Sequence, residues 1–328
     1  VSYSVRILAC SFLIFLAFSL VGFSTSISFK LYGVCFSSMQ TALGESTVLS
    51  LASRYDSQWA ITMWSSGTGM AGVIGYGYMY VVHIWWGLNF KNTLLLANFL
   101  SVGLCFTFFV VLGPIPKPKQ NSLANGDSES LISSSICCLN GNSGMNSRET
   151  ARYVASLWPY MGPLCLVYFA EYCMQAGAWS AIGFPITSEI ARKRFYVYAN
   201  WMYQLGVFIS RSSAVIFSPS PLAIQIAMPL LQLILMLFFC LNSISHFWYD
   251  NSLLVLCLCA GFLGGGVYVG SFILVAKKEP LNRKELALSA VTLADTVGIC
   301  LADLCGLFIQ ACIYKYNHID GSTVQCML

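Results

Sequence analysis

The feature that most constrains this chain is a series of long apolar stretches, each long enough to cross a lipid bilayer. A transmembrane helix needs roughly 20 mostly apolar residues, whereas a barrel strand needs about 10 with alternating polarity. The stretches here are continuous, so they predict helices rather than strands. There are nine of them, at 5–23, 29–52, 59–84, 93–112, 158–182, 199–217, 222–243, 252–276 and 286–312.

The low charge content of the chain excludes a soluble protein. Only 9% of its 328 residues are Asp, Glu, Lys or Arg, whereas 57% are apolar or aromatic. Ordinary soluble domains carry about 25% charged residues on the surface that faces water. The sequence therefore predicts an all-α, polytopic membrane protein whose surroundings are the lipid bilayer. We expect no nucleic acid among its partners.

Residues 113–157 divide the chain into two groups of helices. This segment is rich in Ser, Asn, Gly, Pro and Lys, and it predicts a flexible linker between a four-helix bundle at 1–112 and a five-helix bundle at 158–328. Most Lys and Arg residues of the loops fall on the side of this linker, which the positive-inside rule assigns to the cytosol. The basic run at 192–194 is an exception, on the opposite side.

A glycine motif lies inside the third apolar stretch. Residues 67–72 match the dinucleotide fingerprint G-x-G-x-x-G, but that motif works only between a strand and a helix, so we interpret the match as chance. Gly67, Ala71 and Gly75 are four residues apart, a spacing that lets two helices approach closely in lipid. We expect this stripe to pack against another helix.

A second glycine cluster, Gly264-Gly265-Gly266 with Gly270, lies in the eighth stretch. Close helix packing is the interpretation we favour. The alternative is a flexible, partly broken helix beside a substrate path.

Sequence motifs for catalysis or metal binding are missing. The chain has no hydrolase elbow, Walker loop or HExxH motif, and its three His residues are scattered near helix ends. Most of its 14 Cys residues lie inside the apolar stretches, where Cys behaves as a small apolar side chain. We therefore predict no enzyme activity, no cofactor and no metal site.

The linker contains a short pattern that resembles a sorting signal. Asp127, Leu131 and Ile132 fit the acidic-dileucine spacing [DE]-x-x-x-L-[LI]. Sorting adaptors that direct membrane proteins to endosomes and lysosomes recognise such signals in cytosolic loops. A pattern of six residues also arises by chance.

Five ionisable residues lie well inside the predicted spans. Each costs at least ~2.5 kcal/mol at the bilayer centre, so each should face a partner or a cavity. A purely structural alternative is that each of these residues forms a fixed ion pair between helices and only sets their packing. From the rise of 1.5 Å per residue, all but Asp303 lie at similar depth, and we expect these four to line one polar chamber. The five are Glu45, Glu171, Arg211, Asp295 and Asp303.

Two glutamines extend this predicted site. Gln175 follows Glu171 on one helical face, and Gln204 precedes Arg211 by seven residues. A buried arginine is suited to anchor a phosphate or carboxylate. A buried carboxylate is suited to carry a proton, so we assign proton coupling to Glu171 together with Glu45 or Asp295.

Six motifs, in order along the chain, resemble those of the battenin family of lysosomal membrane proteins. They are Leu43–Leu51, Trp64–Gly72, Tyr168–Tyr172, Gln204–Ser213, Leu263–Val269 and Ala294–Ile299. The resemblance implies a fold like that of the major facilitator superfamily, in which two helix bundles rock around a central site. It also implies residence in late endosomes and lysosomes.

The resemblance implies transport but does not identify the solute. Family members are linked to export of glycerophosphodiesters, to transport of basic amino acids such as arginine, and to lysosomal pH and autophagy. We therefore expect a small solute, and protons, as partners. The alternative is a membrane scaffold that does not transport and that regulates trafficking and acidification through partners bound to loop 113–157.

The sequence departs from the family in two ways. The family has two further helices before the equivalent of 5–23, so we expect a chain that lacks them. The run from Arg6 to Phe23 also resembles a signal peptide, although its apolar core is longer than usual. Asp303 falls where the family pattern is small and uncharged, which leaves its role open.

Overall fold

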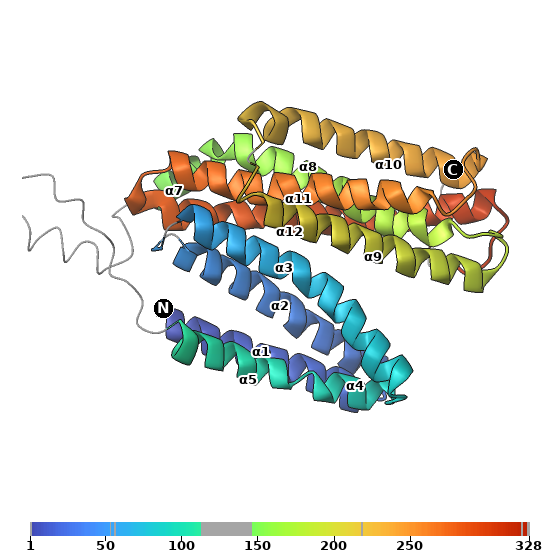
Figure 1. Ribbon diagram of the computed structural model, residues 1–328, viewed down its shortest axis with the longest axis horizontal. Helices are drawn as coiled ribbons and strands as arrows, with labels where there is room; N and C mark the ends of the chain where they lie inside the picture. Colours follow the sequence, from blue (N-terminus) through green and yellow to red (C-terminus); the bar gives the residue numbers. More distant parts are fainter. Residues whose placement is uncertain are drawn as a thin grey trace, which may run out of the picture.

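The computed structural model describes residues 2–52, 54–55, 57–112, 146–217, 219–322 and 324–326. All regular structure in these ranges is helical, which confirms the all-α prediction (Figure 1). Each of the nine predicted spans is occupied by helix. The four spans before the linker comprise α1 (Tyr3–Phe23), α2 (Ile27–Ala52), α3 (Ser57–Met79) with η1 (Tyr80–Trp85), and α4 (Phe90–Leu96) followed by α5 (Phe99–Phe106) and η2 (Thr107–Val111).

The helices after the linker form the second bundle. They are α7 (Ser147–Ser156), α8 (Trp158–Cys173) with η3 (Met174–Ala178) and η4 (Trp179–Ala181), α9 (Glu189–Ser213), η5 (Ala223–Ala227) with α10 (Met228–Ser245), α11 (Leu253–Lys278) and α12 (Leu281–Tyr316). By length and hydropathy, five described segments could cross a membrane on their own: Tyr3–Phe23, Phe90–Val111, Ala223–Ser245, Leu253–Lys278 and Arg283–Tyr316. Helices α2, α3, α8 and α9 carry more polar residues, because they contribute much of the site described below.

The end of the predicted linker is a helix. Helix α7 starts after Asn146, whose backbone N–H donates to the Glu149 carboxylate at 3.1 Å. The Tyr153 hydroxyl donates to Glu279, between α11 and α12, at 2.5 Å. Burial first, and then this bond to a carboxylate, raise the pKa of Tyr153. The expectation of a flexible linker is therefore wrong for 147–156. The predicted sorting residues Asp127, Leu131 and Ile132 lie outside the described residues.

Helix α11 is at the centre of the second bundle, and its glycines face three different neighbours. A Cβ atom at Gly264 would overlap the Glu171 carboxylate of α8, and one at Gly265 would lie 2.9 Å from the Val207 carbonyl oxygen of α9. At Gly270 it would lie 2.6 Å from Ile224 of η5. Because α11 is continuous from 253 to 278, these contacts confirm the close-packing interpretation of this cluster over the broken helix.

Helix α3 packs against α9 through a different face from the one we predicted. Among the described residues, and apart from the backbone of α3 itself, nothing lies within 4 Å of a Cβ atom built at Gly67 or Gly75. The close approach is instead at Gly69, 3.0 Å from the Phe208 Cα, and at Gly72, where a Cβ atom would overlap Gln204. The prediction of a Gly67-Ala71-Gly75 interface is therefore wrong. The glycines that touch α9, Gly69 and Gly72, are three residues apart, so the four-residue spacing did not identify the packed face.

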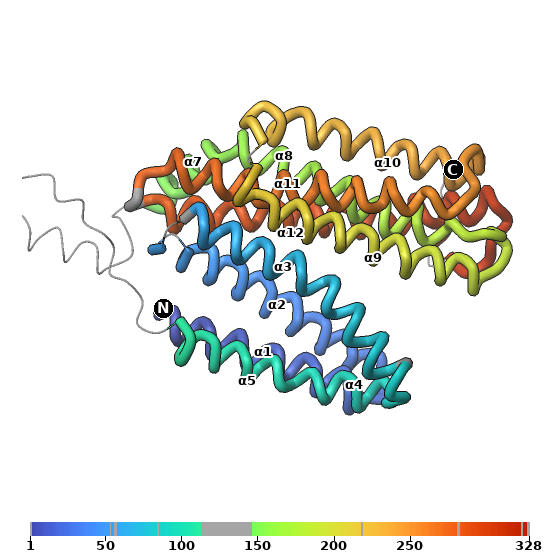
Figure 2. The backbone as a smooth tube through the Cα atoms, in the orientation of Figure 1, coloured from blue at the N-terminus to red at the C-terminus, as the bar shows by residue number. Residues whose placement is uncertain are grey.

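The two bundles meet most closely at the end that holds the N-terminus and α7, and they diverge toward the opposite end (Figure 2). At the closed end, Leu49 of α2 and Ile61 of α3 belong to the same buried cluster as Phe272 of α11. Glu285 of α12 accepts a hydrogen bond from the Tyr3 hydroxyl at 2.8 Å. The same carboxylate lies 3.7 Å from the Arg54 guanidinium, so polar contacts join the bundles there as well.

Two residues of the basic run at 192–194 have partners within the protein. Arg192 is buried, donates to the Ile186 carbonyl at 2.5 Å, and lies over the Tyr314 ring at 5.7 Å. Lys193 pairs with Glu189 at 2.6 Å. These contacts explain how basic residues are accommodated at the end opposite the linker.

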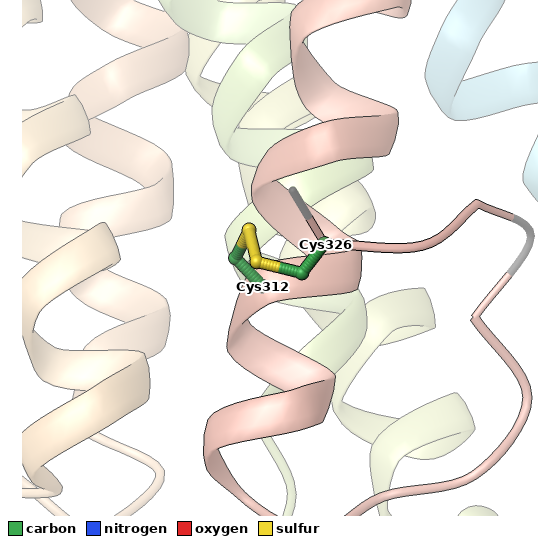
Figure 3. Close-up of a disulfide and its surroundings, with 2 residues drawn as sticks. All are labelled: Cys312 and Cys326. Atoms are coloured by element: carbon green, nitrogen blue, oxygen red, sulfur yellow. A yellow bond between two sulfur atoms is a disulfide. The ribbon is translucent and has the colours of Figure 1, made fainter. Parts of the chain in front are cut away.

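A disulfide joins Cys312 of α12 to Cys326 in the segment that follows it (Figure 3). The two residues are 14 apart in the chain and their Cα atoms lie 4.8 Å apart. Nearby, the Asn317 side chain donates to the Ser243 carbonyl of α10 at 2.8 Å. The sequence analysis, which treated the cysteines as small apolar residues, missed this bond.

Candidate functional site

Arg211, near the C-terminal end of α9, is the centre of a polar cluster between the two bundles. The residue is only 9% exposed. One amino group donates to the Thr68 hydroxyl of α3 at 2.6 Å, and the other donates to the Tyr168 hydroxyl of α8 at 3.0 Å. The third donor, Nε, has no hydrogen-bond partner among the described residues. Two neutral hydroxyls are therefore the hydrogen-bond partners of this buried cation.

Tyr268 of α11 lies between Arg211 and Glu45. The Arg211 guanidinium carbon is 3.9 Å from the centroid of the Tyr268 ring, a close cation–π contact. The Tyr268 hydroxyl donates to the carboxylate of Glu45, on α2 in the other bundle. A single side chain thus touches both a basic and an acidic residue of the predicted site.

Glu171 of α8 is fully enclosed within the second bundle. Its carboxylate accepts hydrogen bonds from the Tyr203 hydroxyl of α9 at 2.7 Å and from the Gln232 amide of α10 at 3.3 Å. Gly264 of α11 packs directly against it. Glu171 lies near enough to Arg211 for the two charges to interact, but it contacts its own bundle and not the first.

Asp295 of α12 is buried beside α8 and α2. Its described hydrogen bonds are local, with the Thr296 backbone N–H at 2.7 Å and the Thr296 hydroxyl at 3.4 Å. Its charge interacts with those of Glu45 and Arg211. Packing on α8 is close here, because a Cβ atom at Gly298 would overlap the Cys165 carbonyl.

Glu45, Glu171, Arg211 and Asp295 therefore gather in one region, whereas three other polar residues do not join it. Gln204 lies two turns from Arg211, against Gly72 of α3. Gln175 lies in η3, and its amide nitrogen has no partner among the described residues. Asp303 is exposed on α12, about 12 Å along the helix from Asp295, and its charge acts on Tyr172.

The alternative of fixed ion pairs does not describe this cluster. Among the described residues, Arg211 has no carboxylate oxygen within 4.0 Å, and the ion pairs present are Arg54–Glu285 and Lys193–Glu189. The charges are instead separated by tyrosine and threonine hydroxyls. A single anionic group placed beside Arg211 would meet a cation that no acidic side chain neutralises at close range.

The sequence analysis missed four residues that build the site. Thr68, Tyr203, Gln232 and Tyr268 hold Arg211, Glu171 or Glu45 by direct contact. Gln232 offered a signal, since it is a polar side chain in the middle of a strongly apolar stretch. Tyr203 and Thr68 did not, because only the packing of α9 against its neighbours shows which way they point.

Together, these observations define a multi-pass membrane protein of the major facilitator type of fold with a buried polar cluster between two helix bundles. The fold resembles that of the human organic anion transporter MFSD10 (TETRAN), with a TM-score of 0.58 at 15% identity, over 97% of this chain and 75% of that one.

The model of the CLN3 protein family matches residues 1–316, and the chain belongs to this family. It is 33% identical to Protein BTN1 of Yarrowia lipolytica over 309 residues, which cover 92% of this chain and 77% of that protein. It is 32% identical to Battenin of Canis lupus familiaris over 313 residues, 93% of this chain and 70% of that protein. The battenin-family resemblance and the major-facilitator-like fold are confirmed.

Proposed function

We propose that this protein is a carrier that moves a small solute with an anionic group across a membrane by alternating access. One observation carries the proposal. Arg211 is buried between the two bundles, yet its described hydrogen-bond partners are neutral hydroxyls and one of its donors is unused. Burying a cation costs several kcal/mol unless an anion compensates it, so this arrangement suits a site that an anionic ligand completes.

The chemistry of the guanidinium selects the ligand group. Its planar fork of N–H donors matches the paired oxygens of a phosphate or carboxylate. A glycerophosphodiester offers such oxygens, and so does the carboxylate of a basic amino acid such as arginine. MFSD10, the structural neighbour, is described as an organic anion transporter, which agrees with an anionic group on the solute.

We assign proton coupling to the carboxylates around this cation. Glu45 and Asp295 lie close enough for their charges to interact, and Glu171 interacts with Arg211. Carboxylates that share a buried site with each other and with one cation exchange protons as the cation is neutralised by a ligand. Gln175 and Gln204 stay candidates for contact with the solute along the path that leads to Arg211.

The orientation we propose has the linker in the cytosol and the disulfide on the lumenal side. Disulfides persist in oxidising compartments and are rare in the cytosol. The Cys312–Cys326 bond lies at the end of α12 remote from α7, which agrees with the positive-inside rule. The closed end of the molecule, with Tyr3, Arg54 and Glu285, then faces the cytosol.

We place the carrier in the membrane of late endosomes and lysosomes, where proton-coupled export would contribute to lumenal pH and to autophagy. Sorting adaptors would recognise Asp127, Leu131 and Ile132. Replacing Leu131 and Ile132 by Ala should then redirect the protein to the cell surface, as scored by surface biotinylation.

The experiment that tests the function is uptake into proteoliposomes at several pH values. A labelled glycerophosphodiester, arginine and uncharged glycerol serve as solutes, and empty liposomes as the control. We expect saturable uptake of at least one of the two charged solutes, stimulated by a proton gradient, and no uptake of glycerol above that of empty liposomes. Equal protein-dependent uptake of all three, or of none, would exclude this function.

A scaffold is the second candidate, and helix α7 favours it. This helix packs against the core only through the half-buried Tyr153 and Val154, so most of its surface is exposed, and it lies at the end of the loop that would hold partners. Deleting 133–145 and replacing the exposed Arg148 and Arg152 of α7 by Ala, while keeping the sorting residues 127–132, separates the two functions. A carrier keeps both its solute flux and its cellular effect, whereas a scaffold loses its cellular effect.

A further inference from the structure

We propose that Tyr268 is the positioning residue that couples protonation of Glu45 to separation of the two bundles, and that it does so while holding Arg211 in place. This inference rests on the proposed function and specifies how a proton would drive it. Two contacts carry it, the ring of Tyr268 with Arg211 and its hydroxyl with Glu45. The second joins α11 to α2, which belong to different bundles, beside the packing of α2 on α12 and of α3 on α9 and α11.

The Tyr268 side chain is rigidly held. It is 1% exposed and is one of the largest fully buried side chains. Phe272 packs edge-on against its ring at a centroid distance of 4.8 Å, and Tyr168 lies at 6.2 Å on another side. A ring fixed in this way keeps its hydroxyl pointed at Glu45 without the rotamer freedom of a surface side chain.

Glu45 faces charged or titratable groups on four helices. These are Tyr268 of α11, Arg211 of α9, Asp295 of α12 and Tyr168 of α8. One is a cation, one is a carboxylate, and two are phenols. Of these four residues, Tyr268 donates a hydrogen bond to the Glu45 carboxylate.

The consequence of protonation follows from this geometry. Ionised Glu45 accepts a charge-assisted hydrogen bond from Tyr268 and is attracted to Arg211, so α2 is drawn to α11 and α9. When Glu45 takes up a proton, the attraction to Arg211 ends and the hydrogen bond becomes one between neutral groups, which is about half as strong. Acidification therefore loosens the joint between the bundles.

The ring and the hydroxyl of Tyr268 have separable roles. The ring supports the Arg211 guanidinium whatever the charge on Glu45, because a cation–π contact does not involve the hydroxyl. The hydroxyl makes the hydrogen bond that weakens when Glu45 takes up a proton, alongside the loss of attraction to Arg211. Removing only the hydroxyl should therefore take away most of the coupling between the proton and bundle separation and leave the anion site intact.

The test compares Tyr268→Phe with Tyr268→Leu in proteoliposome uptake between pH 5 and 7, with Tyr172→Phe as the matched control. Tyr172 also packs against Tyr168, at 6.2 Å, and it interacts with the charges of Glu171, Arg211, Asp295 and Asp303 without the hydrogen bond to Glu45 that Tyr268 makes. We expect the Phe variant to keep KM within twofold and to lose most of the pH dependence of uptake. The Leu variant should raise KM about tenfold, and the control should behave as wild type.

Hydrogen exchange gives a readout that does not depend on transport. In wild-type protein, exchange in 45–52 and 268–276 should speed up as the pH falls, after correction for intrinsic rates. In Tyr268→Phe, and in the permanently neutral Glu45→Gln, it should be fast at every pH. If the Phe variant matches wild type in pH-dependent uptake or exchange, the inference is wrong. If no solute is taken up but the exchange pattern is as expected, the proposed function fails while the switch stands.

Discussion

The carboxylate of Glu171 occupies the space into which a side chain at Gly264 would extend. A Cβ atom built on Gly264 would overlap Oε1 of Glu171, which accepts a hydrogen bond from Gln232, while Oε2 accepts one from Tyr203. The glycine thus lets α11 approach α8 closely enough to enclose an acidic side chain among four helices. The position of Glu171 depends on this close approach.

Gly264→Ala should therefore destabilise the protein. Overpacking a tight interior costs typically about 1–3 kcal/mol, and here the group displaced is a buried carboxylate with two hydrogen bonds. We expect a lower melting temperature in detergent. Gly103→Ala on α5, where nothing lies within 4 Å of the new Cβ atom, serves as the control and should melt no lower than wild type. Equal melting of the two variants would show that α8 and α11 are not this close.

The face of α3 that packs against α9 can be tested by a second pair of glycines. Gly72→Ala places a methyl group on the Gln204 side chain, whereas Gly75→Ala, less than one turn away, meets open space. We expect Gly72→Ala to lower the melting temperature by several degrees and Gly75→Ala to leave it unchanged or to raise it. The reverse result would favour the interface predicted from spacing alone.

These glycines show how far sequence reasoning reaches in a membrane protein. The spans were predictable because lipid demands long apolar helices, and the depth of each charge followed from the helical rise. The rotation of each helix about its own axis was not predictable. Gly67 and Gly75 have a spacing typical of a packed face, and yet other glycines of α3 touch α9. Neighbours across helices, such as Tyr268 for Arg211, depend on that rotation.

The same limit applies to the ends of elements. Helix α7 could be recognised only by its capping residues, Asn146 and Glu149, within a segment whose composition resembles a linker. The Cys312–Cys326 bond required the chain after α12 to turn back on itself, which no periodic pattern indicates. Hydropathy indicates which segments lie in lipid, but it does not predict the conformation of short polar segments such as α7 or the residues after α12.

The disulfide provides a prediction about the compartment. In membranes prepared with a thiol-blocking reagent, Cys312 and Cys326 should react with a maleimide only after reduction. Cys312→Ser should free Cys326 for reaction and destabilise the protein by up to about 3 kcal/mol, the loop-closure contribution expected for a loop of this length. Reaction of both cysteines without reduction would argue against the lumenal orientation.

Glu285 provides a prediction about the closed end. Glu285→Gln retains an acceptor for the Tyr3 hydroxyl but loses the charge pairing with Arg54, whereas Glu285→Ala loses both. Because an exposed ion pair is worth about 0–1 kcal/mol, the Gln variant should change little. The Ala variant should expose the cytosolic end, measured as faster protease cleavage or hydrogen exchange at 49–52 and 283–288.

If Glu285→Gln speeds cleavage and exchange as much as Glu285→Ala does, then the ion pair rather than the hydrogen bond holds this end closed. Lys284→Gln, on the neighbouring position of α12, is the control for a change of charge at the same depth. It should leave cleavage and exchange as they are in wild type.

The most direct measurement of the central claim is equilibrium binding of a glycerophosphodiester to the purified protein and to Arg211→Lys and Arg211→Ala. Hydrogen bonds to charged groups contribute about 1.5–3 kcal/mol, so Arg211→Ala should weaken binding by one to two orders of magnitude. Lys keeps the charge without the fork and should fall between the two. Arg283→Ala, exposed at the closed end of the molecule, should bind as wild type. Binding by Arg211→Ala within twofold of wild type, in protein that melts normally, would contradict the assignment of Arg211 as the anion site.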